Sequence, residues 1–227
     1  MKYHIDTQLL KEKFIKESEC PLCDVKKTVE DQIVYEFLND AVMDDDMRIK
    51  VNKYGFCRHH FDLLFAGKNK LSLALQLSTR VMKIKGGFTP PKNFKSAKKL
   101  AEQLRAKTKT CVICDILNES MEKYYKAVAM LYKKEPEFRE IVKNGKGFCM
   151  EHFACLLENA SESSAFSKEY LQTLSNLFYD NTDRFLSELD RFCKKHDYRN
   201  ALMPLGSAEN VLPRTGDKLY GKKNIKQ

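Results

Sequence analysis

Apolar residues recur every three or four positions along much of this chain, which is the spacing typical of amphipathic α-helices. Asp24 is placed to cap one such helix, and the acidic run at 44–46 ends it before a shorter helix from Met47 to Lys53. The apolar positions of the first of these helices are Val25, Val29, Ile33, Val34, Phe37, Leu38 and Val42. This pattern predicts an all-α protein.

Further helices follow from the same spacing. A short amphipathic piece covers Leu9 to Ile15, and a basic amphipathic helix runs from Ser96 to Lys107. Between them, a largely buried helix is predicted from Leu71, Ala74, Leu75, Leu77, Val81 and Met82. The last long helix begins near Ser167, and its seam consists of Leu171, Leu174, Phe178, Phe185, Leu189 and Phe192. We expect an irregular tail after it, at 197–227, because prolines and glycines interrupt that segment.

The chain contains an internal duplication. Cys20-Pro-Leu-Cys23 and Gly55-Phe-Cys57-Arg-His-His60 return as Cys111-Val-Ile-Cys114 and Gly147-Phe-Cys149-Met-Glu-His152. The offset is 91 residues for the first motif and 92 for the second, after one insertion near Gly145. A period of this length with two copies indicates a pseudo-symmetric pair, because solenoid repeats are shorter and more numerous.

A break between the two copies suggests the domain boundaries. Gly86-Gly87-Phe88-Thr89-Pro90-Pro91 is the strongest helix-breaking stretch in the sequence. We therefore expect a first helical metal-binding repeat at 1–85, a basic linker and helix at 86–109, a second repeat at 110–196, and the tail at 197–227.

Each copy offers three thiols and an imidazole. A C-x-x-C pair on a tight turn and a C-x-x-H pair at the start of a helix are able to converge on one tetrahedral ion, the closed Cys3His arrangement of structural zinc. The spacing predicts that each copy closes its own site, so that two zinc ions staple two helical units. The candidate ligands are Cys20, Cys23, Cys57 and His60 in the first copy, and Cys111, Cys114, Cys149 and His152 in the second.

Two alternatives for these sites stay open. Three thiolates and a histidine are also able to hold an iron–sulfur cluster, although zinc is the first choice for this ligand set. His59 neighbours His60 and competes with it for the first metal, but its counterpart in the second copy is Glu151, which favours His60 as the ligand.

The formal net charge of +9 lies in one segment. Between Arg80 and Lys109 there are ten basic residues and one acid, so this stretch alone carries +9. Such a strip is either a solvated connector or a surface for phosphate backbones and acidic partners. If the strip binds nucleic acid, we expect the contacts to come from Lys92, Lys95, Lys98, Lys99 and Arg105.

The remaining composition points to a cytoplasmic protein. No window reaches the length of apolar chain that crosses a bilayer, and the polar N-terminus lacks the apolar core of a signal peptide. In a reducing compartment, paired cysteines are expected to be metal ligands in preference to disulfides.

The sequence is compatible with several functional classes and favours a protein that is not an enzyme. A four-ligand metal site has no open position for water, and no nucleophile elbow, phosphate loop or dinucleotide fingerprint occurs. We expect a non-enzymatic module that binds a protein partner or regulates one. The alternatives are a nucleic-acid-associated factor that uses residues 80–109, and a thiol or metal redox sensor.

The chain resembles an uncharacterised family of bacterial proteins, a domain of unknown function. The likeness rests on the opening Lys2-Tyr3-His4-Ile5-Asp6-Thr7, on the two C-x-x-C and G-F-C-x-x-H motifs, and on the late segment 195–199. The resemblance implies that the eight cysteines and histidines of those motifs are metal ligands, and it implies no activity. This chain departs from the family in its tail, which lacks tryptophan.

Overall fold

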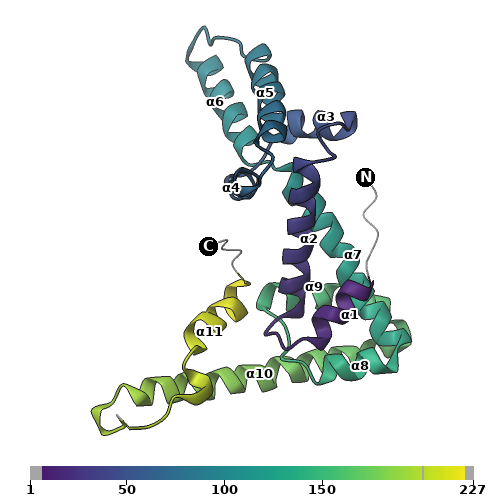
Figure 1. The fold of residues 1–227 in the computed structure, drawn as a ribbon, viewed down its shortest axis with the longest axis vertical. Coiled ribbons are helices and arrows are strands. Elements are labelled where there is room, and N and C mark those ends of the chain that lie inside the picture. The colour runs from purple at the N-terminus through teal and green to yellow at the C-terminus, as the bar shows by residue number, and fades with distance from the viewer. Residues whose placement is uncertain (1–6, 201, 223–227) are drawn as a thin grey trace. The chain divides into compact units, whose positions relative to one another are not determined.

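The computed structural model describes residues 7–200 and 202–222, and within these ranges the chain is helical without any strand (Figure 1). The all-α prediction is confirmed. No helix of the described residues combines the length and the apolar character needed to cross a bilayer. The α-helices are α1 (Thr7–Ile15), α2 (Pro21–Leu38), α3 (Asp45–Tyr54), α4 (Arg58–Ala66), α5 (Lys70–Gly86), α6 (Phe94–Thr108), α7 (Val112–Lys134), α8 (Pro136–Lys143), α9 (Met150–Glu158), α10 (Ser167–Lys195) and α11 (Val211–Tyr220).

The helices form two compact units. Unit 1 comprises the described parts of Met1–Lys27 and Ser120–Gln227, and unit 2 comprises Thr28–Glu119. The unit boundaries fall inside α2 and α7, so each of these helices contributes to both units. The units therefore cut across the two sequence copies: each contains one C-x-x-C motif and the G-F-C-x-x-H motif of the other copy.

Unit 1 is built around α10. The buried side of this helix includes Leu174, Leu177 and Phe185, and short 3-10 segments as well as α11 pack against it. At the other end of the unit, α1 packs on α8, where the rings of Phe14 and Phe138 lie 5.1 Å apart. The first turn of α2 and the start of α9 belong to this unit and carry the chemistry described below.

In unit 2, α5 packs against α3 and α4. Asp44 caps α3 by accepting a hydrogen bond from the Met47 backbone N–H at 3.1 Å. The acidic run therefore starts α3, but it does not end the preceding helix, because α2 already ends at Leu38 and Val42 lies in the turn that follows. Phe56 then packs edge-on against Phe37, with ring centroids 5.8 Å apart. This contact places the G-F-C motif of the first copy beside the C-terminal end of α2.

The prediction that the helix over 71–82 is largely buried is wrong. Leu73, Gln76 and Arg80 face the interior of unit 2, whereas Val81 and Met82 are 62% and 61% exposed. The apolar set used for the prediction lies mostly on the opposite face of α5, and three polar residues, Ser72, Gln76 and Arg80, occupy the buried face beside Leu73. In α6, which follows, none of the residues is buried.

The tail is more ordered than its composition suggests. The prolines and glycines of 197–227 predict irregular chain, but Val211–Tyr220 forms α11. Pro213 falls in the first turn, where a helix does not need its backbone N–H. Ion pairs from Arg214 to Glu19 and Glu188, with N–O distances of 2.9 and 2.6 Å, then hold the helix on unit 1.

Candidate metal centres

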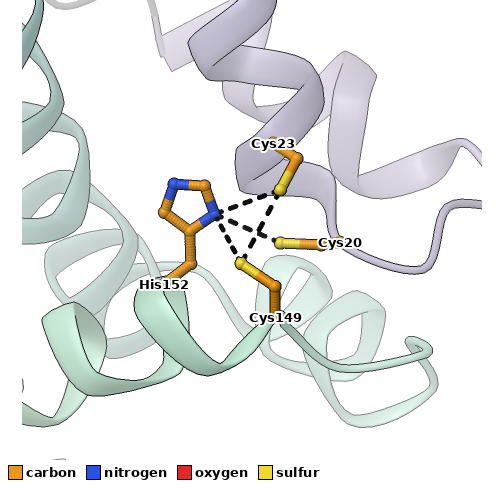
Figure 2. Close-up of side chains that lie close together, drawn as sticks. All are labelled: Cys20, Cys23, Cys149 and His152. Atoms are coloured by element: carbon orange, nitrogen blue, oxygen red, sulfur yellow. Dashed lines mark hydrogen bonds between the residues drawn. The ribbon is translucent and has the colours of Figure 1, made fainter. Parts of the chain in front are cut away.

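Four ligand-type side chains meet in unit 1 (Figure 2). Cys20 and Cys23 lie just before and within the first turn of α2, and Cys149 and His152 hold the same positions on α9. The Nδ1 atom of His152 is 3.3, 3.4 and 3.2 Å from the sulfur atoms of Cys20, Cys23 and Cys149. All four residues are buried, so a single ion at their centre would be shielded from solvent. We call this group the unit 1 centre.

A second group with the same chemistry lies in unit 2, and we call it the unit 2 centre. It is formed by Cys57, His60, Cys111 and Cys114, from the starts of α4 and α7. Nδ1 of His60 is 3.2, 3.4 and 3.2 Å from the sulfur atoms of Cys57, Cys111 and Cys114. Here Cys57 and Cys114 are only half-buried.

The predicted residues are all brought together, but the predicted grouping is wrong. Each centre takes its C-x-x-C pair from one copy and its C-x-x-H pair from the other. The cause is the length of the helix between the motifs. At 1.5 Å per residue, the 18-residue α2 carries the chain about 27 Å along its axis before it turns toward Cys57. The G-F-C-x-x-H motif of the first copy therefore meets Cys111 and Cys114 of the second.

Both G-F-C motifs use a glycine in the left-handed region. Gly55 has φ 69° and Gly147 has φ 73°, a conformation that other L-residues rarely adopt. In unit 2 the carbonyl of Gly55 also accepts a hydrogen bond from the Val112 N–H at 3.0 Å, which ties the two ligand pairs together. Pro21 stands at the position equivalent to Val112 and has no N–H to donate, so unit 1 lacks this bond.

Without a cation, the thiols of the unit 1 centre titrate very unequally. Hydrogen bonds from Cys20 and Cys23 hold the pKa of the Cys149 thiol far below its ordinary value. Burial raises the pKa of Cys20, and the hydrogen bond to Cys149 raises the pKa of Cys23 to about 11. One thiolate is thus stabilised at the expense of its neighbours, and a bound metal ion would remove this conflict by supplying positive charge.

The unit 2 centre shows the same competition. The hydrogen bond from Cys114 lowers the pKa of Cys111 to about 3 and raises that of Cys114. Burial lowers the pKa of His60, but hydrogen bonds to Cys111 and Glu30 outweigh burial and raise the pKa to about 10. These neighbours hold a proton on His60, and a metal ion bound at Nδ1 would displace it.

A carboxylate supports the histidine of the unit 2 centre. Oε1 of the buried Glu30 lies 3.2 Å from Nε2 of His60 and 3.0 Å from Nε2 of His59. This is the carboxylate–histidine–metal arrangement that fixes the orientation of a ligand ring. His60, not His59, faces the three thiols, and the His59 side chain is 47% exposed, as the comparison with Glu151 predicted.

In the part of the chain that the structure describes, no such carboxylate supports the histidine of the unit 1 centre. Nε2 of His152 is buried and has no hydrogen-bond partner among the described residues, and Met121 occupies the position equivalent to Glu30. Instead, α11 covers this centre. Lys218 donates to the carbonyls of Glu19 and Lys146 at 3.0 and 2.6 Å, and the backbone N–H of Lys222 donates to the thiol of Cys23.

Sequence reasoning missed Glu30, Lys218 and Lys222. The duplication gave no signal for Glu30, because its counterpart is an apolar residue, and the two lysines lie in a segment that reads as irregular. The five residues expected to contact nucleic acid are all exposed and lie on or just before α6, and none of them belongs to either ligand set.

Comparison with known proteins places the chain in a family without assigning it an activity. Residues 1–226 match a family described as "Family of unknown function (DUF6062)". The chain belongs to this family. It is also similar to an uncharacterized 23.9 kDa protein in the xynA 3′ region of Caldicellulosiruptor sp. (strain Rt8B.4), with 27% identity over 190 residues that cover 82% of this chain and 86% of the relative. No solved structure matches.

Proposed function

We propose that the protein binds two zinc ions, one in each centre, and that they hold its helices together as a non-enzymatic scaffold for a protein partner. The observation that carries the zinc assignment is the spacing of the donor atoms. The sulfur atoms of Cys23 and Cys149 are 3.7 Å apart, and those of Cys57 and Cys114 are 3.8 Å apart. Two thiolates on one tetrahedral zinc ion, each at about 2.3 Å, are separated by about 3.8 Å.

The same spacing supports a single ion over a cluster of several metals. In each centre the four donor atoms lie within 4.8 Å of one another. An iron–sulfur cluster distributes its ligands over different iron atoms and so holds them farther apart. Four protein ligands close the coordination sphere, which is the arrangement of structural zinc and leaves no position for a catalytic water.

The test is elemental analysis with an absorption spectrum, on protein purified anaerobically without added metal. We expect two zinc ions per chain and a colourless sample. Iron with visible absorption would contradict the zinc assignment and make redox chemistry the leading hypothesis. One metal per chain would show that one of the two centres is not a site.

A redox sensor is the competing use of the same thiolates. The cover over the unit 1 centre and the four-ligand closure of both centres favour a structural role. Mild peroxide, followed by measurement of released zinc with a chromophoric chelator, separates the two functions. A structural site retains its metal while control thiols react, whereas rapid release with disulfide formation would support the sensor.

The surface proposed for a partner is the segment 70–108, which contains α5 and α6. It is basic, and it exposes an unusual number of large apolar side chains: Leu71, Leu75, Val81, Met82, Phe88 and Phe94. Exposed apolar side chains that gather into a patch mark protein-binding sites in soluble proteins, and we propose that those of this segment form such a patch. The positive charge of the segment favours an acidic partner.

Substitutions on this surface test the partner proposal. Val81→Ser combined with Met82→Ser removes exposed apolar area without opening the core, and Leu186→Ser combined with Leu202→Ser removes two exposed side chains elsewhere. A partner recovered by affinity purification with the wild type and the control, but not with the 81/82 variant, is the expected result. Recovery that is equal with all three proteins would place the contact elsewhere.

A second candidate is a nucleic acid, and one observation favours it. Five exposed basic residues of this segment form no ion pair with an acidic side chain in the described chain: Lys92, Lys95, Lys98, Lys99 and Arg105. Unpaired surface cations are available for phosphates, and binding through them weakens steeply with salt.

Charge reversal tests this candidate. Glutamate at 92, 95, 98 and 99 should abolish binding of a labelled duplex at low salt and flatten its salt dependence. The matched control reverses four other exposed lysines: Lys126, Lys133, Lys134 and Lys168. Equal loss of duplex binding in both variants would show that the protein binds the duplex by general charge attraction and not through this segment.

A further inference from the structure

A pocket of about 440 Å³ lies in unit 2 next to the metal ligand Cys57. Phe56, Phe61 and Leu77 give it an apolar wall, and Arg58, Arg80 and Lys107 give it positive charge. Its volume lies within the range of small-molecule sites, which typically combine apolar walls with a few polar groups. No acidic side chain lines it.

Arg80 is the feature that suggests a ligand. It is only 8% exposed, and its one hydrogen bond among the described residues is donated to the backbone carbonyl of Asn52. No carboxylate in the described part of the chain forms an ion pair with it, and burial lowers its pKa. A buried charge is costly unless it is paired, so a guanidinium in this position is suited to an anion that comes from outside the chain.

The backbone is shaped around this guanidinium. A Cβ atom at Gly55 would lie 3.2 to 3.4 Å from Nε, Nη2 and Cζ of Arg80, so only glycine gives the guanidinium this space without adjustment. Gly55 also lines the pocket. The charged group is thus held against the pocket wall, and a guanidinium presents its donors as a planar fork, the geometry that suits a carboxylate or phosphate.

In unit 1, side chains of α10 and α11 fill the space beside Gly147, which is the counterpart of Gly55. Beside Gly147 lie Nδ2 of Asn181 and Nζ of Lys218, and Lys218 belongs to α11. The Lys218 ammonium there is satisfied by two backbone carbonyls. Beside Gly55 the side chain in this position is Arg80 of α5, and the space next to it stays open as the pocket.

We propose that this pocket binds a small organic anion, whose carboxylate or phosphate pairs with Arg80 and whose apolar body packs against Phe61 and Leu77. Lys107 at the exposed rim adds attraction for negative charge, whereas Arg58 at the rim is already paired with Asp62 at 2.9 Å. The site is a second function of unit 2 and does not depend on which metal the neighbouring centre holds.

The experiment uses the full chain with its metal content measured, and three probes of similar size: benzoate, phenyl phosphate and the neutral benzyl alcohol. Saturation-transfer NMR detects binding, and calorimetry gives the affinity. We expect at least one of the two anions to bind with a dissociation constant of about 1 mM or tighter, and the alcohol to bind at least about tenfold more weakly, because it cannot form the charge-assisted hydrogen bonds. Equal binding of the alcohol and the anions, or no binding of either anion, would overturn the proposal.

Two variants locate the site. Arg80→Met keeps an apolar stem and removes the charge, so it should weaken the anion about tenfold or more. Arg139→Met is the control, because Arg139 also donates to backbone carbonyls but lies in unit 1, and its affinity should match the wild type. Unchanged anion affinity in Arg80→Met would overturn the proposal.

A third variant keeps the test valid if Arg80→Met fails to fold. Thr108 is exposed and lines the pocket, so Thr108→Trp places a large ring there without disturbing the core. With metal content and helical circular dichroism unchanged, this variant should lose anion binding. Retained binding would show that the anion sits outside this pocket.

Discussion

The two metal centres have the same ligands and different surroundings. In unit 1, all four ligands are buried, α11 lies over them, and no carboxylate of the described residues supports the histidine. In unit 2, two of the thiols are half-buried, and Glu30 supports His60. The duplicated sequence thus gives one candidate centre that α11 covers and one whose histidine faces a carboxylate, so we expect the two to differ in their chemistry toward a metal although their ligand sets are equal.

Removing one ligand from each centre should give the largest effects. Cys149→Ser and Cys57→Ser are each expected to reduce the metal content from two ions to one. The loss of helical content and melting temperature should be greater for Cys149→Ser, because its centre is fully buried in unit 1. Metal analysis and thermal melts followed by circular dichroism measure both. Unchanged metal content in either variant would remove that cysteine from the ligand list.

Metal affinity should rise with pH at both centres. Cys23 has its pKa raised to about 11 and His60 to about 10, so at neutral pH the metal must displace protons from both. Each displaced proton changes the apparent affinity about tenfold per pH unit, with weaker binding as pH falls. Competition with a chromophoric chelator at several pH values measures the slope. An affinity that is independent of pH would show that the ligands are already deprotonated.

The substitution Glu30→Gln should weaken metal binding at the unit 2 centre and leave the unit 1 centre unchanged. The amide keeps the shape of the side chain but loses the charge that faces His60, so the unit 2 centre is expected to bind its metal about 10- to 100-fold more weakly. The unit 1 centre in the same molecule is the internal control and should be unaffected. Equal weakening of both centres would indicate a general loss of stability.

Weakening the contacts of α11, which covers the unit 1 centre, should have a smaller effect, and this effect should be on the rate of metal release. Lys218→Met removes two hydrogen bonds to backbone carbonyls, and we expect the slower of the two metal ions to leave a few-fold faster. The exposed Lys143, which also pairs with carboxylates in unit 1, provides the control Lys143→Met. Release into excess chelator, followed by absorbance, should be biphasic in the wild type. Identical kinetics in all three proteins would mean that α11 does not restrict release.

Much of this molecule could be predicted from local sequence. Apolar spacing located α1, α2, α3, α5, α6 and α10, although it missed α11, and the repeated motifs identified all eight candidate ligands. The grouping of ligands could not be predicted in this way, since it depends on how far α2 carries the chain before Cys57. The burial of Arg80 and the exposure of Met82 were missed because which face of an amphipathic helix is covered depends on its packing partners.

The most direct test of the crossed grouping is the metal content of two double variants. Cys20→Ser with Cys149→Ser removes two ligands of the same centre and should leave one metal ion per chain. Cys20→Ser with Cys57→Ser damages both centres and should leave none. The reverse result, none in the first variant and one in the second, would contradict the crossed arrangement and show that each copy closes its own site.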